Sequence, residues 1–588
     1  MPDNFTAAIL VMSQPTHRTG ATLFFDTLVD LGVEHIFGHT GGAVIPLHVE
    51  LNKRMRRGQV SPKFILCRQE GGAGHAAEGY ARVSGRVGVA LATSGPGATN
   101  LVTPIADAYK DSIPTLFITG QVPSFAIGSD AFQEVDTIGM TRPISKHNYL
   151  VKDVRDLEWV LREAYALTQR GRPGPVVVDI CKDVQLALAA EANLPRLRHR
   201  EVTPFDAGKA DAILTALVSA HRPVIKAGGG IIHAEAAATL QAFAERFQVP
   251  VATTFNALGA IPFDRPYYLG MPGMHGAIPA NYALREADLI LSLGGRFDDR
   301  VAVRDFAAGK RIAHVDIDPS ELDKCIRTEL ALVGDLKVFL DYALASGQSA
   351  RHPKWLARIE VWRQQMPKPY LQTEHIKPQA VIEALSSLTR GDATLVTGVG
   401  QHQMWSAQYY RFSRPRQWIS SGGLGTMGFG LPAAIGAWFA KPDKPLVLID
   451  GDGSFQMNIQ ELATVAANRV PVKMFVLNNS FLGMVRQWED MMDEGHHYET
   501  CLARSAECKP DCTLTDPACR RQIPDLLGLE QVYPRIRASR IVDTAHLWQG
   551  LRDALDAPGP ALVDIWIDKT EDVLPMVKPG QGLNQMIE

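Results

Sequence analysis

Short apolar runs rich in β-branched residues alternate with longer helical patterns along almost all of the 588-residue chain. Each run has the length of a strand that is buried on both faces. Strands that alternate with helices are typical of βαβ units, whose crossovers build parallel sheets. The sequence therefore predicts an α/β fold with doubly wound, mainly parallel sheets. Strands are expected at Lys63–Cys67, Val87–Ala92, Thr115–Thr119, Val176–Ile180, Pro223–Lys226, Pro250–Thr254, Leu289–Leu293, Arg311–Asp316, Thr394–Thr397, Pro445–Asp450, Val472–Asn478 and Ala561–Ile567.

Two polar connections, Ala189–Thr203 and Ser346–Pro378, divide the chain into thirds of similar size. The first is rich in arginine and the second in proline, and both interrupt the strand–helix alternation. Length alone favours about four domains, with three or five nearly as plausible, and the connections favour three. We predict three α/β domains and a Gly- and Pro-rich closing tail, at residues 16–188, 204–348, 376–567 and 568–588, respectively.

The charge balance excludes several classes of function. The chain has 60 basic and 63 acidic residues and a net charge of −3, so it offers no strong field for holding nucleic acid or a lipid surface. No apolar run is long enough to span a bilayer, and residues 5–12 lack the basic start and cleavage site of a signal peptide. Seven cysteines are few for this length, which fits a reducing compartment. We therefore expect a cytoplasmic protein without nucleic-acid or membrane partners.

The strongest polar constellation follows two successive predicted strands of the last third. Gly451-Asp452-Gly453-Ser454 follows the first, and Asn479 follows the second after a helical stretch. Parallel strands of one βαβ unit end at the same sheet edge, so Asp452 and Asn479 are expected side by side. Carboxylate and amide oxygens suit a hard divalent cation, and the glycines let the backbone approach a phosphate. The alternative, a tight turn and an unrelated loop, is disfavoured by the spacing of the two motifs.

This pattern resembles the cofactor motif of thiamine diphosphate-dependent enzymes. The resemblance implies three domains in the order pyrimidine-binding, central and diphosphate-binding, which matches the three thirds of the chain. It implies a diphosphate site at Gly451, Asp452, Gly453 and Ser454. It also implies an Mg²⁺ site formed by Asp452, Asn479 and Phe481.

A second motif, Arg68–His75, ends the first predicted strand and opens a helix. It resembles the activating-glutamate motif of the same enzymes, with Glu70 as the acid against N1′ of the aminopyrimidine. Proton exchange there yields the 4′-imino form, which removes the C2 proton of the thiazolium. Taken alone, Glu70 is better explained as a first-turn acid that complements the helix dipole, but beside the diphosphate motif the catalytic role is favoured. In the family the glutamate and the diphosphate site come from different subunits, which implies a homodimer or homotetramer.

The stretch Leu424–Gly430 resembles the family segment that bends the cofactor. Met427 would be the bulky wedge and Gly425 a neighbouring contact, whereas the competing interpretation of the polarizable Met427 is core packing. By the same resemblance, Gln401 and His402 are further cofactor contacts.

The chain from about Thr19 to Glu588 resembles the acetohydroxyacid synthase (acetolactate synthase) family of catalytic subunits. The motifs that carry this are Asp130–Asp136, Thr141–Asn148, Gly400–Trp405 and Gly483–Trp488. The resemblance implies decarboxylation of pyruvate on thiamine diphosphate and ligation of the hydroxyethyl group to a second 2-oxo acid. Pyruvate as acceptor gives 2-acetolactate, toward valine and leucine, and 2-oxobutyrate gives the isoleucine precursor. It also implies a regulatory small subunit.

Two other classes stay open. Another thiamine diphosphate 2-oxo acid carboligase or a pyruvate oxidase is disfavoured by Trp488 in its motif and by Arg296–Arg300. A non-catalytic scaffold is disfavoured because Glu70, Asp452 and Asn479 are all present.

The second substrate is a small anion with an apolar tail, which suits a guanidinium beside an aromatic wall. By resemblance Arg300 is the carboxylate partner and Trp488 the wall, and the wall's preference for one extra methylene is worth about 1–3 kcal/mol. The alternatives are an ion pair of Arg300 with Asp298 or Asp299, and core packing of Trp488. Further candidates for the catalytic pocket, carried over in the same way, are Gln121, Phe132, Lys146, Met274 and Val399.

The central third carries glycines and charged residues where its predicted strands end. Gly228 and Gly229 follow one strand, Arg296 another, and Asp316 ends a third, which is a generic dinucleotide-site pattern. None of these central-third motifs is a GxGxxG, and taken alone these residues are better explained as turns. The family resemblance implies that FAD binds here without a redox role. Further contacts would be Arg172, His275 and Asp335.

Several positions depart from the family pattern. Gln69 replaces a usual His, and Thr40 and Cys181 replace usual prolines. The stretch Phe255–Ala257 differs beside the expected flavin, which weakens the FAD assignment more than the carboligase assignment.

The region after Trp488 is longer than in the family and contains four cysteines without a CxxC pair. A surface insertion is favoured there over a metal or redox cluster. The cysteines are Cys501, Cys508, Cys512 and Cys519.

Overall fold

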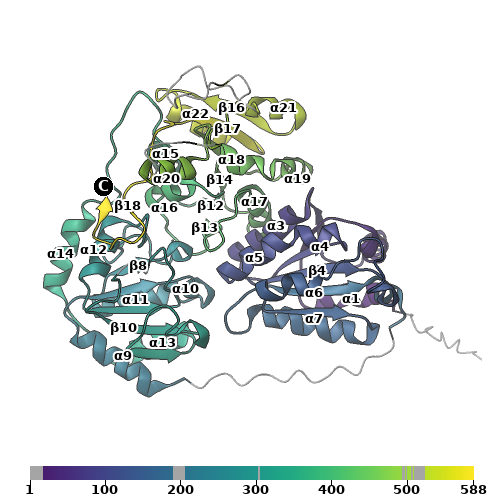
Figure 1. Cartoon of the computed structure of the whole chain (residues 1–588), viewed down its shortest axis with the longest axis horizontal. Coiled ribbons are helices and arrows are strands. Elements are labelled where there is room, and N and C mark those ends of the chain that lie inside the picture. The colour runs from purple at the N-terminus through teal and green to yellow at the C-terminus, as the bar shows by residue number, and fades with distance from the viewer. Residues whose placement is uncertain are drawn as a thin grey trace, which may run out of the picture.

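Three open parallel sheets, each covered by helices, form the protein (Figure 1). This computed structural model describes residues 18–189, 205–301, 305–492, 497, 499–504, 508 and 524–588. Every pairing within the three large sheets is parallel, which confirms the α/β prediction. The domain boundaries themselves stay predictions.

The N-terminal sheet has the strand order β2-β1-β3-β4-β6-β5. Helices α1, α2 and α7 pack their apolar faces on one side of it, and α3 and α5 pack on the other. Its strands are β1 (His35–Gly38), β2 (Lys63–Leu66), β3 (Gly88–Ala92), β4 (Thr115–Gln121), β5 (His147–Val151) and β6 (Val176–Cys181). Its helices are α1 (Gly20–Asp30), α2 (Ile45–Arg56), α3 (Glu70–Ser84), α4 (Pro96–Asn100), α5 (Val102–Asp111), α6 (Thr137–Thr141), α7 (Val154–Gln169) and α8 (Lys182–Leu186).

The central sheet has the order β11-β10-β9-β7-β8, with α9, α11 and α13 on one face and α12 and α14 on the other. Its strands are β7 (Pro223–Ala227), β8 (Val251–Thr253), β9 (Leu289–Leu293), β10 (Arg311–Asp316) and β11 (Leu330–Val333). Its helices are α9 (Ala207–Ser219), α10 (Gly230–His233), α11 (Ala237–Phe247), α12 (Ile278–Glu286), α13 (Leu336–Ala345) and α14 (Pro353–Arg363).

The C-terminal sheet has the order β13-β12-β14-β15-β17-β16, and residues of the tail add the antiparallel pair β18–β19. Its strands are β12 (Thr394–Thr397), β13 (Trp418–Ile419), β14 (Leu446–Gly451), β15 (Lys473–Asn478), β16 (Arg537–Ile541) and β17 (Ala561–Trp566), and the tail has β18 (Met576–Val577) and β19 (Met586–Ile587). Its helices are α15 (Pro378–Leu388), α16 (Gln401–Tyr409), α17 (Gly430–Ala440), α18 (Asp452–Gln456), α19 (Leu462–Asn468), α20 (Gly483–Met492), α21 (Leu529–Val532) and α22 (Leu547–Asp556).

All of the strands expected from the sequence are present, within a residue or two at their ends. The strands that the sequence did not indicate are short, and β5, β11, β13 and β16 lie at sheet edges, where a strand pairs with only one neighbour. The first half of the second polar connection, 346–378, contains α14. Pro353 starts this helix because a proline at the first helical position loses no hydrogen bond. The other connection, Ala189–Thr203, lies outside the described residues apart from Ala189.

Helices α3 and α17 join the N-terminal and C-terminal sheets into one continuous core. Their backbones approach closely through two glycines. A Cβ on Gly79 would overlap the Ala433 carbonyl oxygen, and one on Gly436 would overlap the Ala76 carbonyl oxygen. This crossing sets how the carboxyl edge of the C-terminal sheet faces the N-terminal sheet.

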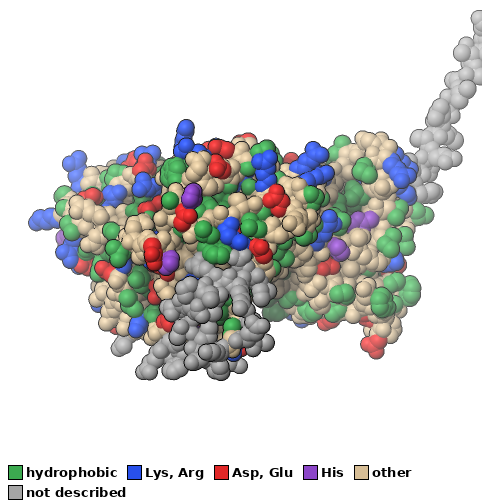
Figure 2. All heavy atoms as spheres, turned by 90° about the horizontal axis from the view of Figure 1, so that it is seen from above, with side chains coloured by type: hydrophobic (Ala, Val, Ile, Leu, Met, Phe, Trp, Pro, Cys, Tyr) green, Lys and Arg blue, Asp and Glu red, His purple; other side chains and the backbone are tan. Residues whose placement is uncertain are grey.

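Acidic and basic side chains intermingle on the face shown in Figure 2, in keeping with the balanced composition. Across the described ranges, no helix has both the length and the apolar character that crossing a bilayer requires.

Candidate active site

The predicted cation side chains lie at the carboxyl edge of the C-terminal sheet. Strands β14 and β15 are parallel neighbours with Gly451 paired to Leu477, so the expected adjacency of the two motifs is confirmed. Asp452 and Asn479, which follow these strands, are each 6% exposed. The Asn479 side chain accepts from the Phe481 amide (3.0 Å) and donates to Gln401 Oε1 (3.3 Å). The predicted helix between the motifs is broken into α18, a 3₁₀ turn at Ile459–Glu461 and α19.

The Asp452 carboxyl lacks a cationic side-chain partner within the described part of the chain. Burial raises its pKa to about 7. A buried carboxylate without a counter-ion is costly unless a metal or a proton neutralises it. Asp452, the Asn479 amide oxygen and the Phe481 backbone therefore form a set of donors that fits a hard divalent cation.

Helix α16 brings Gln401 and His402 to the same edge. The Gln401 amide donates to Gln487 Oε1 (2.9 Å) and to the Glu571 carbonyl (3.2 Å). His402 Nε2 lies 3.4 Å from Asp450 Oδ1, and burial lowers the pKa of this imidazole to about 3, so it is neutral at physiological pH. The structure thus gathers the predicted diphosphate residues around the ends of β12, β14 and β15.

Met427 reaches over the GDG turn. A Cβ on Gly453 would lie 3.6 Å from Met427 Cε, and Met427 is half-buried, so it is not part of the core. Gly425 has φ 77°, a conformation that L side chains rarely adopt. Ser454 Oγ accepts from the amides of Val399 (3.3 Å) and Gly428 (3.1 Å), which ties this loop to the turn.

Glu70 is the first residue of α3, and the N-cap Gln69 accepts from the Gly72 amide (2.9 Å). The Glu70 carboxylate accepts from Asn100 Nδ2 (2.9 Å). Glu461 Oε1, from the C-terminal domain, accepts from the amides of Arg68 (2.9 Å) and Gln69 (3.0 Å). The amino end of α3 is therefore anchored to the C-terminal domain through Glu461.

The predicted substrate side chains lie on two different elements. Arg300 is exposed, its Nη1 donates to Met274 Sδ (3.3 Å), and the Met274 amide donates to the Arg300 carbonyl (2.7 Å). Among the described residues, its guanidinium forms no ion pair with Asp298 or Asp299, so the salt-bridge alternative is wrong. Trp488 is half-buried on α20, which also argues against simple core packing.

Three further candidates have their side-chain hydrogen bonds within the N-terminal domain or face solvent, as far as the described residues show. Gln121 donates to Asp179 Oδ2 and to the Val135 carbonyl, each at 2.9 Å, so its amide is already in use. Lys146 Nζ donates to two carbonyls at the end of α7, and burial lowers its pKa to about 8. Phe132 is 89% exposed. Their role in the pocket stays a prediction.

The predicted flavin residues surround the carboxyl edge of the central sheet. Gly228 lies where a Cβ would overlap the Gly294 carbonyl oxygen, so this glycine is required by a close backbone approach. His275 Nε2 is buried without a hydrogen-bond partner among the described residues, and burial lowers the pKa of this imidazole to about 4. A bare glycine turn and an unsatisfied buried nitrogen fit a bound dinucleotide.

Other predicted flavin residues already have protein partners. Arg172 donates to Glu321 (2.6 Å) and Asp318 (3.4 Å), and Asp335 caps α13. Gly229, Arg296 and Asp316 also lie at the ends of β7, β9 and β10.

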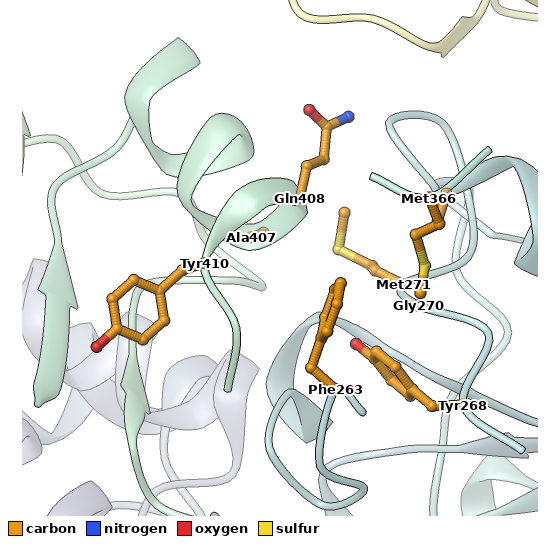
Figure 3. Close-up of a pocket in the computed structure, with 9 residues that line it drawn as sticks. Phe263, Tyr268, Gly270, Met271, Met366, Ala407, Gln408 and Tyr410 are labelled. Atoms are coloured by element: carbon orange, nitrogen blue, oxygen red, sulfur yellow. The ribbon is translucent and has the colours of Figure 1, made fainter. Parts of the chain in front are cut away.

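A small pocket lies between α16 and the central domain (Figure 3). Phe263, Tyr268 and Met271 point toward one another in it while Tyr410 turns away. No predicted site residue lines it. Gln408, at its rim, donates to the His275 carbonyl (3.1 Å).

Sequence reasoning missed Glu461 and the amide chain through Gln487. Glu461 bonds to residues 392 and 393 positions away, and no local pattern encodes such a contact. Of the four clustered cysteines, Cys512 and Cys519 lie outside the described residues, and the backbone of Cys501 pairs with that of Phe481 in an isolated antiparallel β-bridge. The question of a metal or redox cluster stays open.

Comparisons with known proteins identify the class. Three family models of thiamine pyrophosphate enzymes match the chain. The N-terminal TPP-binding domain matches residues 18–140, the central domain matches residues 210–342, and the C-terminal TPP-binding domain matches residues 398–565. The chain belongs to the thiamine pyrophosphate enzymes.

Within that class the chain belongs to the acetolactate synthase family. It is 43% identical over 587 residues to acetolactate synthase 1, chloroplastic, of Zea mays, covering 97% of this chain and 89% of that protein. It is 41% identical over 583 residues to the acetolactate synthase large subunit of Lactococcus lactis, covering 98% and 97%. The large subunit of Corynebacterium glutamicum is also 41% identical, over 580 residues, covering 97% and 90%.

Proposed function

We propose that the chain is a thiamine diphosphate-dependent acetolactate synthase that joins the two-carbon remnant of pyruvate to pyruvate or 2-oxobutyrate, in the synthesis of branched-chain amino acids. One observation carries this proposal. Asp452 is buried without a cationic side-chain partner among the described residues, and the domain that carries it is tied to the start of the Glu70 helix by Glu461. The family membership supports the same reaction.

Bound thiamine diphosphate would supply the carbon nucleophile and take up the electron pair left by CO₂. Asp452, Asn479 and the Phe481 backbone would hold Mg²⁺ against the diphosphate. Glu70 would hold a proton at the pyrimidine nitrogen and return it. The neutral His402 would contribute hydrogen bonds without adding positive charge.

Substrate selection would depend on Arg300 and Trp488. The guanidinium of Arg300 would bind the carboxylate of the second 2-oxo acid, because a planar fork matches two carboxylate oxygens. Trp488 would cover its aliphatic tail. Gln121, Lys146, Phe132, Met274 and Val399 stay candidates for the rest of the pocket.

We further propose that FAD binds at the carboxyl edge of the central sheet. Its contacts would be Gly228, Gly229, His275, Arg296, Asp316, Asp335 and Arg172. Arg172 would then exchange its carboxylate partners for the flavin nucleotide.

We propose a homodimer or homotetramer with a regulatory small subunit, located in the cytoplasm. The name "large subunit" in the bacterial relatives supports a small partner.

The test is an assay of the purified chain with pyruvate, omitting thiamine diphosphate, Mg²⁺ and FAD in turn. We expect acetolactate that requires the first two. Acetate and peroxide would indicate a pyruvate oxidase, and the absence of any product would indicate a non-catalytic scaffold. Glu70→Gln should lower kcat about 100-fold or more, whereas Glu50→Gln, a buried carboxyl of the same domain paired with Arg54, should not. Mixing Glu70→Gln with Asp452→Ala subunits should restore activity if the halves pair between copies.

A further inference from the structure

A loop of the C-terminal domain, residues 421–426, immediately precedes Met427 and is held by a carboxylate of the N-terminal domain. Asp107 Oδ2, on α5, accepts from the hydroxyls of Ser421 and Thr426, both at 2.6 Å. Ser421 Oγ in turn accepts from the amides of Gly425 (3.0 Å) and Thr426 (2.9 Å). One buried carboxylate therefore fixes both ends of the loop and, through Ser421, its interior turn.

A second carboxylate, one helical turn along α5, strengthens this hold. Asp111 accepts from the Gly422 amide and from Asn256 Nδ2 of the central domain, both at 2.8 Å. Arg82 on α3 donates to Asp111 (2.8 Å) and lies 3.4 Å from Asp107. The guanidinium compensates both acids, which are buried among charged and polar partners from all three domains.

The same neighbourhood contains His75, Glu78 and Asp107, whose ligand atoms lie close enough together to hold a metal ion. Arg82 Nη2 is 3.6 Å from Glu78 and 3.4 Å from Asp107, so the Arg82 guanidinium already supplies the positive charge that a metal ion would bring to these carboxylates. A divalent ion there would be repelled by the guanidinium. The cluster therefore works as an ionic and hydrogen-bonded lock.

The loop needs these external hydrogen bonds because its own backbone can adopt several conformations. Gly425 and Gly428, on either side of Met427, have φ 77° and 84°. Glycines tolerate many conformations, so external hydrogen bonds must select one. Thr426 is joined to Met427 by a single peptide, and a displaced Thr426 would displace the wedge side chain with it.

We propose that Asp107 is a positioning residue for Met427, so that the domain carrying Glu70 also sets the side chain that bends the cofactor. This inference rests on the proposed function. It implies that the bend is imposed only after the two domains dock, because Asp107 and Glu70 belong to the same domain. Cofactor affinity, which depends on the cation edge, and cofactor activation, which depends on the bend, are then separable.

The test uses Thr426→Val, which removes one donor to Asp107 at nearly constant volume, and Asp107→Ala. At saturating thiamine diphosphate and Mg²⁺, we expect the rate of C2 hydrogen–deuterium exchange on the bound cofactor and kcat to fall about tenfold or more, because small misplacements have large effects on reactivity. The dissociation constant of the cofactor should change less than about threefold. Thr426→Ser, which keeps the hydroxyl, should restore exchange, and Glu50→Gln is the matched buried-acid control.

Outcomes are distinguishable. Exchange at the parental rate in Thr426→Val would overturn the positioning role. A loss of cofactor affinity as large as the loss of exchange rate would also overturn it, because it would indicate a merely structural effect. If Asp107→Ala fails to fold, Thr426→Val still decides. A parent chain that binds thiamine diphosphate without any C2 exchange would overturn the proposed function and, with it, this inference.

Discussion

A lysine is buried in the middle of the central sheet, and its charge has a measurable cost. Lys226 on β7 is 0% exposed and pairs in register with Ser292 of β9. Its Nζ donates to the Arg296 carbonyl (2.8 Å), lies 3.4 Å from Ser292 Oγ, and sits 4.4 Å from the Phe297 ring centre. These partners compensate the ammonium only in part, because burial lowers its pKa from 10.5 to about 8.

The perturbation is Lys226→Met, which keeps the aliphatic stem and removes the charge. A shift of about 2.5 pKa units at 1.36 kcal/mol each corresponds to about 3 kcal/mol of destabilisation at neutral pH. The folded protein binds fewer protons than the unfolded chain between pH 8 and 10.5, so stability should rise with pH across that window. Methionine removes this cost but leaves the Arg296 carbonyl without its donor, which costs about 1–3 kcal/mol. We expect a net gain of about 1 kcal/mol near pH 7 and no alkaline rise.

Gly295 provides the matched test of geometry. A Cβ there would lie 2.9 Å from Lys226 Nζ, so Gly295→Ala should cost about 1–3 kcal/mol in the parent. In the Lys226→Met background the Nζ atom is absent, and the cost should fall by about 1 kcal/mol.

The assay is urea unfolding at neutral and alkaline pH for the parent, both single variants and the double variant. An alkaline rise that survives Lys226→Met would refute the buried-charge reasoning. Strict additivity of the two substitutions would refute the contact between them.

Three other predictions concern the N-terminal sheet, the tail and the domain crossing. Burial raises the pKa of Asp179 to about 6, so between pH 3.8 and 6 the folded state binds a proton that the unfolded chain does not. The free energy of unfolding should therefore fall by up to about 3 kcal/mol as pH rises through that window, and Asp179→Asn should flatten that part of a pH–stability curve. Arg486 is 3% exposed and pairs with Asp572 at 2.6 Å. Arg486→Met should therefore lower the free energy of unfolding by about 3 kcal/mol and speed cleavage of the tail in limited proteolysis, and cleavage rates equal to those of the parent would contradict this. A side chain at Gly436 would overlap a carbonyl oxygen of α3, so Gly436→Ala should lower the melting temperature by several degrees and reduce acetolactate formation, whereas Gly528→Ala, with nothing within 4 Å, should do neither.

Local pattern determined the sheets and one half of the site. The central strands are continuous apolar runs because both of their faces are buried, and that property is visible in a window of a few residues. The pairing of β14 with β15 followed from the handedness of a single βαβ unit, so Asp452 and Asn479 could be brought together without a structure.

Tertiary structure decided what depends on docking between domains. Glu461 meets the start of α3 across 392 residues of sequence, and Asp107 holds a loop more than 300 residues later. No periodicity encodes these contacts, because they exist only after α3 and α17 cross at their glycines. The burial of Lys226 likewise depends on tertiary structure. Its neighbours in sequence predict a strand, but only the packing of Phe297 and the turn at Gly295 exclude water from its ammonium group. Composition and spacing thus determined which chemistry the chain carries, and the three-domain packing decided which groups hold that chemistry in place.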